Sequence, residues 1–235
     1  MMSANALSLA LVILTSACLV AGPANAQQEP PKVQIPQPGV PEVMTMEGQY
    51  VRAAYNNEGY VILGYRVANL SVGDEWMLLE IGATLRDGVP GYTMTRDALS
   101  LETPDGKKIP LASVSEFRKA HLAALEQRAR VARDSINYFP PGAVHACRIG
   151  FFSDVEDRAM PWDQVELTNQ RACLGRLYFL VPGGIAYGQH WLDVKFEKSL
   201  VRVPFRILTK EEQKLLSKHY KDISKQVEEA FKKKN

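Results

Sequence analysis

The ten residues from Trp76 to Leu85 constrain the fold more than any other part of the sequence. One alternating set is apolar and the other is mixed: Met77, Leu79, Ile81, Ala83 and Leu85 against Trp76, Leu78, Glu80, Gly82 and Thr84. Because successive side chains of a strand point to opposite faces, this alternation predicts a half-buried strand with a mixed outer face. Such a strand needs a second layer to cover its apolar face.

Short segments of the same kind recur along most of the chain. We expect further strands near residues 60–68, 92–102, 107–111, 143–152, 174–181, 187–196 and 200–208. The clearest turn is Thr103-Pro104-Asp105-Gly106, where proline presets one turn residue and glycine tolerates positive φ. The sequence therefore predicts a mainly β fold, an immunoglobulin-like antiparallel β-sandwich over residues 49–208, with one inserted and one C-terminal α-helix.

Residues 1–26 have the pattern of a signal peptide. An apolar run from Leu7 to Ala21 precedes the small residues Ala24 and Ala26, so we expect cleavage after Ala26. The alternative is lipid attachment at Cys18, although the preceding residues lack the leucine expected there. Residues 27–48 contain five prolines and should form an extended linker or arm.

Export changes how the cysteines are interpreted. Cys147 and Cys173 are the two that remain after cleavage, and an even count in an oxidising compartment indicates a disulfide. A disulfide between Cys147 and Cys173 closes the loop of chain between them, which stabilises the fold by roughly 3–4 kcal/mol in the chain-entropy model. Two buried free thiols, or a metal site that includes His145, are the alternatives. The spacing does not match a metal motif, and we expect no metal.

A helical pattern occupies residues 114–136. Ser113 and Glu116 form a capping box, and a stripe from Leu122 to Ile136 repeats every three or four residues. The opposite face is basic, with Arg118, Lys119, Arg128, Arg130 and Arg133. We interpret this face as solvated; the alternative is a surface for an anionic partner such as a phosphate or an acidic polysaccharide.

Residues 209–235 predict a second amphipathic helix. Thr209 and Glu212 form its capping box. Its apolar stripe contains Tyr220, Ile223, Val227 and Phe231, which we propose as an interaction surface. The helix could dock on the sandwich, or it could project and bind a partner.

Recognisable catalytic sequence motifs are absent, so we expect a protein that is not an enzyme and has no cofactor. The four histidines (His121, His145, His190 and His219) are far apart in sequence, and Trp76, Trp162 and Trp191 are more typical of packing than of a sugar platform. The acidic segment 153–170 lacks the spacing of a calcium loop, and we interpret it as solvated. The alternative is a carbohydrate-active or hydrolytic protein with a cleft of Trp, His and acidic side chains.

Several runs resemble a known family. They are Val67 with Asn69, the strand from Trp76 to Ile81, Asp97 to Leu101, Pro104 to Lys107, and Tyr178 to Pro182. Together they are similar to the telokin-like immunoglobulin-fold domains of secreted bacterial proteins. The resemblance implies a β-sandwich with a binding or envelope-associated role and transfers no catalytic residue. The two predicted helices depart from that pattern.

Charge limits the partners. A net charge of +2 predicts no strong attraction to nucleic acid or to an anionic membrane. After the leader, the sequence contains no further apolar run long enough for a transmembrane segment. We therefore expect a periplasmic or secreted, non-enzymatic binding module of the bacterial cell envelope, whose partner is an unidentified protein or envelope component.

Overall fold

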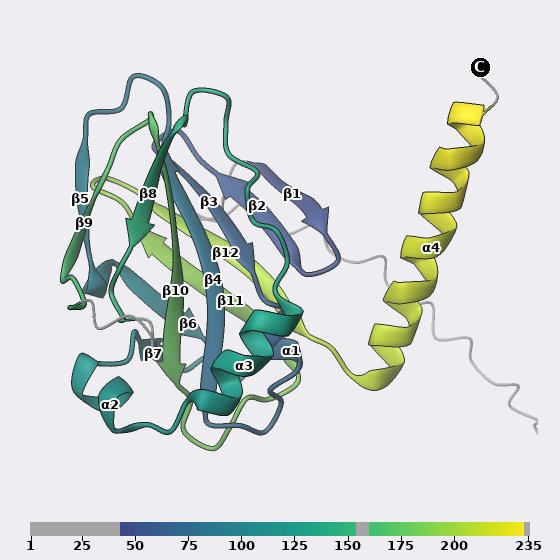
Figure 1. The fold of residues 1–235 in the computed structure, drawn as a ribbon, viewed down its shortest axis with the longest axis horizontal. Coiled ribbons are helices and arrows are strands. Elements are labelled where there is room, and N and C mark those ends of the chain that lie inside the picture. The colour runs from purple at the N-terminus through teal and green to yellow at the C-terminus, as the bar shows by residue number, and fades with distance from the viewer. Residues whose placement is uncertain (1–42, 154–159, 233–235) are drawn as a thin grey trace, which may run out of the picture. The chain divides into compact units, whose positions relative to one another are not determined.

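The computed structural model describes residues 43–153 and 160–232, and these form a mainly β protein (Figure 1). The largest sheet has six strands in the order β1-β2-β3-β4-β10-β8. Their bounds are β1 Val43–Gly48, β2 Val51–Tyr55, β3 Gly59–Gly64, β4 Trp76–Leu85, β10 Arg171–Leu180 and β8 His145–Ile149.

A four-stranded sheet has the order β12-β11-β6-β7, with β12 Leu200–Ile207, β11 Gly188–Lys195, β6 Leu99–Glu102 and β7 Lys108–Pro110. It lies behind the six-stranded sheet in Figure 1. Side chains of both sheets meet in one apolar cluster, in which Leu79, Phe179 and Val203 have no exposed surface. The second layer required by the alternation in β4 is therefore present.

The outer face of β4 is also covered, so the prediction of a half-buried strand is wrong. Every residue from Met77 to Leu85 is buried. The cover is residues 133–144, which we call the strap and which runs from the preceding helix across the sheet to β8 (Figure 1). Ile136 and Phe139 of the strap pack on a small apolar cluster formed by Val51, Ala53 and Ile62.

Two glycines make room for the strap. A Cβ atom at Gly64 would lie 2.9 Å from Cγ2 of Ile136, and one at Gly82 would lie 2.9 Å from Cζ of Phe139. Larger residues at either position would push the strap away from the sheet. The strap therefore depends on two positions in neighbouring strands that have no side chain.

One strand pair departs from the predicted antiparallel pattern. β8 and β10 are parallel, with Cys147 opposite Cys173, whereas the other strand pairs described are antiparallel. The chain between them crosses over and contributes β9 (Gln164–Leu167) to a separate two-stranded sheet with β5 (Tyr92–Thr95). This crossover lets β8 and β10, which are neighbours in the sheet, run in the same direction.

The predicted hairpin is confirmed, but the strand predicted at 92–102 is divided. Leu101 pairs with Ile109 across the turn, and Gly106 has a φ of 79°. The 3-10 helix Arg96–Ala98 separates β5 from β6 and sends them into different sheets.

The single helix predicted at 114–136 is instead two helices, α2 (Val114–Lys119) and α3 (Ala123–Ala132). The capping box is confirmed, since Ser113 Oγ accepts from the Glu116 amide at 3.1 Å and the Glu116 side chain accepts from the Ser113 amide. The break at Ala120, which is extended, lets Phe117 and Leu125 dock separately. Phe117 packs against Phe152, with ring centroids 4.9 Å apart.

The C-terminal helix α4 (Lys210–Lys232) begins at the predicted capping box of Thr209 and Glu212. Its first turns contact the β domain: Glu212 pairs with Arg206 at 2.8 Å, and Leu216 packs against the core. The helix continues through Tyr220, Ile223, Val227 and Phe231, but those side chains lie outside the described residues. The proposed interaction surface stays a prediction.

The β domain begins earlier than predicted. Residues 43–48, assigned from sequence to the arm, form β1 and pair with β2. The short helix α1 (Arg66–Asn69) follows β3. The predicted signal peptide, the rest of the predicted arm and the acidic positions 154–159 lie outside the described residues.

Candidate functional site

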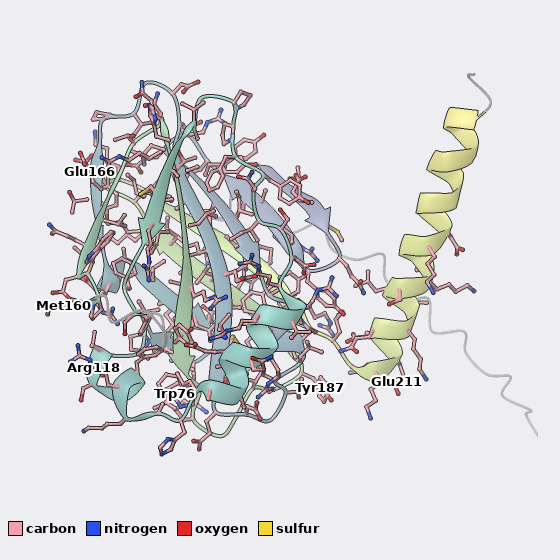
Figure 2. All side chains as sticks on the ribbon, viewed as in Figure 1. Trp76, Arg118, Met160, Glu166, Tyr187 and Glu211 are labelled. Carbon is pink, nitrogen blue, oxygen red and sulfur yellow. A yellow bond between two sulfur atoms is a disulfide. The ribbon has the colours of Figure 1, made fainter. Side chains whose placement is uncertain are left out.

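A cleft of about 810 Å³ lies on the outer face of the six-stranded sheet. Its floor comes from β4, β8 and β10, and its wall comes from α3 and the first residues of the strap. The face that carries it is turned toward the viewer in Figure 2, where side chains of α3 stand in front of β10 and β4.

Four arginines from separate parts of the chain line this cleft. Arg148 and Arg176 come from β8 and β10, and Arg130 and Arg133 come from the end of α3 and the start of the strap. Strand register explains why the floor residues share a face: Arg176 pairs with Glu80, and Arg148 pairs with Leu174. Cross-strand partners point to the same side of a sheet, so both guanidinium groups project toward α3.

Three acidic residues line the cleft, but one of them is paired with an arginine that is not part of the lining. Asp134 forms a two-point ion pair with Arg66, at 2.9 and 2.7 Å, and so pairs with a cation outside the lining. This leaves Glu80 and Glu126 beside the four guanidinium groups. Among the lining residues that the structure describes, four arginines therefore lie with two carboxyl groups that are not held by Arg66, and arginine is well suited to planar recognition of carboxylate and phosphate groups.

Glu80 lies on the floor of the cleft and is 8% exposed. Burial raises its pKa to about 7, although Arg176 and Arg133 oppose the shift, while Asp134 adds to it. A carboxyl group with such a pKa exchanges its proton near neutral pH.

Glu126 and Tyr178 close one end of the cleft. The Tyr178 hydroxyl lies 3.1 Å from the Glu126 carboxylate, to which it donates a hydrogen bond. Burial raises the pKa of Tyr178, and the negative charge of Glu126 adds to the effect. The Tyr178 ring also packs edge-on against Phe117 and Phe152, so this end is anchored by both polar and aromatic contacts.

The basic face predicted for residues 114–136 is divided by the helix break. Arg118 and Lys119 are exposed on α2. Arg128 turns toward the body of the domain and pairs with Asp74 at 2.6 Å. Of these five residues, only Arg130 and Arg133 line the cleft, and both are exposed, so the interpretation of the face as solvated is not contradicted.

The predicted disulfide is confirmed. Cys147 and Cys173 are bonded, with their Cα atoms 4.0 Å apart, and they join the parallel strands β8 and β10. The bond lies directly before Arg148 in the chain. It therefore ties together two strands that each supply an arginine to the cleft.

The histidines and tryptophans of the alternative hypothesis do not gather at one site. His190 is fully buried and stacks on Phe205, whereas His145 is exposed on β8 in the other sheet. His121 is exposed in the loop between α2 and α3 rather than on a helix, and His219 is exposed on α4. The tryptophans lie on different elements: Trp76 begins β4, Trp162 packs on Gly150, and Trp191 of β11 lies under Arg202.

Sequence reasoning missed the residues that form the floor of the cleft. Glu80 was assigned to the outer face of its strand but not to a site, and Arg148, Arg176, Glu126 and Tyr178 were not singled out. A usable signal was present, because Glu80 is the one charged residue in the run from Trp76 to Leu85. A charge within a strand that is otherwise apolar calls for an explanation.

Across residues 43–153 and 160–232, no cluster of three or more His, Cys, Asp or Glu side chains could hold a metal ion. In the same part of the chain, no helix has the length and apolar character needed to span a bilayer. No protein-family model, curated protein or solved structure matches the chain. The resemblance to telokin-like domains therefore stays a prediction.

Proposed function

We propose that this protein is a non-enzymatic binding module whose arginine-lined cleft takes an anionic ligand. The observation that carries the proposal is the convergence of Arg130, Arg133, Arg148 and Arg176 on one concave site. Two of these residues come from regular strands that a disulfide joins, so the floor of the site is held in place before a ligand arrives. Preorganised sites lose less entropy on binding.

The export and envelope parts of the proposal rest on the leader pattern and on the cysteine pair. A disulfide persists in an oxidising compartment, which favours a periplasmic or secreted location. We also propose that the two stacked sheets are an immunoglobulin-like sandwich. N-terminal sequencing of the protein from its natural host tests the leader: a chain beginning at Gln27 supports export, and one retaining residues 1–26 contradicts it.

Calorimetric titration with sulfate at low ionic strength tests the anion site. We expect sulfate to bind, and the double variant Arg133→Gln/Arg176→Gln to weaken its affinity at least about tenfold, because charge-assisted hydrogen bonds are lost. Arg118→Gln is the matched control, since that arginine is exposed on α2 and does not line the cleft. Absence of sulfate binding, or equal weakening by the control, would contradict the proposal.

A hydrolytic function is the second candidate, and one observation favours it. Glu80, with its pKa raised to about 7, lies in the same cleft as Glu126. A carboxyl group that keeps its proton near neutral pH can act as a general acid. Release of nitrophenol from a panel of nitrophenyl glycosides, abolished by Glu80→Gln, would favour this function; equal release by the variant would remove it.

A further inference from the structure

The Glu80 carboxylate lies on the floor of the cleft, where the charges of Arg176, Arg133 and Asp134 act on it. It is more than nine-tenths buried, yet it has no hydrogen bond or ion pair with any other residue in the described ranges. Carboxyl groups buried to this degree are normally paired, because removing them from water without a partner is costly. The Glu80 oxygens line the cleft and remain reachable from it.

Among the described residues, the charged groups around Glu80 do not form an ion pair with its carboxylate. Arg176 on β10 and Arg133 on the strap lie near enough to lower the pKa of Glu80, but neither forms an ion pair with it. Asp134, also on the strap, is held by Arg66. The remaining charged groups of the lining are Glu126 and Arg130 on α3 and Arg148 on β8.

The cleft therefore offers two kinds of contact. Its arginines suit an anionic group, and Glu80 on its floor suits a hydrogen-bond donor. A ligand that carried only negative charge would satisfy the arginines and would add like-charge repulsion at Glu80. A ligand that also carried an ammonium or a hydroxyl group could place it against the carboxylate and remove the unpartnered acceptor.

We propose that the cleft binds a small ligand that carries an anionic group and a separate hydrogen-bond donor, and that Glu80 is the specificity-determining residue that accepts from this donor. The inference rests on the proposed anion site and adds the class of ligand. Arginine contacts supply the attraction for the anionic group, and Glu80 distinguishes ligands that carry a donor from those that do not.

Three matched dicarboxylates test the inference. At pH 8 succinate has no hydrogen-bond donor, malate adds a hydroxyl, and aspartate adds an ammonium. At pH 8, calorimetry should show that the wild-type chain binds malate, aspartate or both about tenfold more tightly than succinate, as expected for a charge-assisted hydrogen bond. A preference for malate would identify the donor as a hydroxyl, and a preference for aspartate would identify it as an ammonium.

The variants assign that preference to Glu80. In Glu80→Gln the tenfold preference should fall to about twofold or less, because a neutral amide accepts more weakly. Glu80→Asp keeps the charge on a shorter side chain and should retain part of the preference. Glu166→Gln is the control, since this exposed residue pairs with Arg171 outside the cleft. The melting temperature of each variant shows whether it is folded.

A pH series adds a readout that a merely structural role would not change. Lowering the pH from 8 to 6 protonates Glu80, so the preference for the favoured acid, malate or aspartate, over succinate should decrease in the wild type and stay flat in Glu80→Gln. The inference is overturned if succinate binds as tightly as both other acids, or if the preference survives in Glu80→Gln. Binding of sulfate without binding of any dicarboxylate also overturns it, whereas failure of all four ligands removes the anion site itself.

Discussion

The two faces of the six-stranded sheet are made by the same strands but differ in what covers them. The inner face meets the second sheet, and Leu79 and Phe179 are fully buried there in one apolar cluster. The outer face meets α3 and the strap, which cover part of it and leave the cleft that contains Glu80. The covering element therefore decides whether a strand face becomes core or binding site.

The inner face should be the more sensitive to truncation. Phe179→Ala removes a fully buried ring from the shared core, and we expect it to lower the free energy of unfolding by about 3–5 kcal/mol. Urea denaturation measures the loss. Sulfate affinity of the folded fraction should stay within about twofold of wild type, and a collapse of affinity would show that the two faces are not independent.

Next in size is the bond between β8 and β10. Reduction of Cys147–Cys173 should cost about 3–4 kcal/mol and lower the melting temperature by about 5–15 °C. Mass spectrometry of the untreated protein should give a mass two hydrogens below the dithiol form. An unchanged melting temperature after reduction, with both thiols free, would show that the disulfide does not stabilise the strands that form the site.

At the outer face, Glu80→Gln should raise stability. The pKa of Glu80 in the folded protein is about 7 against an ordinary 4.5, so between these values the folded chain holds a proton that the unfolded chain has released. Wild-type stability is thus greatest below pH 4.5 with respect to this group and is lost as the pH rises to about 7. At pH 8 we expect the variant to be more stable by about 1–3 kcal/mol, with no gain at pH 4.5.

Denaturant titration at both pH values checks this outcome. The control is Glu166→Gln, an exposed position where neither pH should show a gain. A variant less stable than wild type at pH 8 would mean that the arginines already neutralise Glu80.

The smallest expected effect comes from His190 in the core of the four-stranded sheet. Its contribution to stability decreases as the pH falls, whereas that of Glu80 decreases as the pH rises. Burial lowers the pKa of His190, although the Gly188 carbonyl and Asp105 oppose the shift. The stability due to this group is complete above its ordinary pKa of 6.5 and is lost as the pH falls below that value. His190→Gln should therefore flatten the dependence of unfolding free energy on pH below 6.5; an unchanged slope would contradict this assignment.

Sequence patterns determined the local structure. The strand at β4, the Thr103 to Gly106 turn, both capping boxes and the pairing of Cys147 with Cys173 are all present, although β4 is buried on both faces. Each depends on residues close together in the chain, or on a single pair with no competitor. Short-range sterics and hydrogen bonding act before the rest of the fold is known, so these features can be read from the residues.

Only the tertiary structure determined what covers each face and how the cleft forms. The break at Ala120, the division of residues 92–102 between two sheets and the parallel pairing of β8 with β10 all depend on distant partners. Glu80, Arg176 and Arg133 are far apart in sequence, and strand register and the path of the strap bring them together. Periodicity shows which residues share a face, but it cannot show which other segment will lie against that face, because that choice is made by packing between elements far apart in the chain.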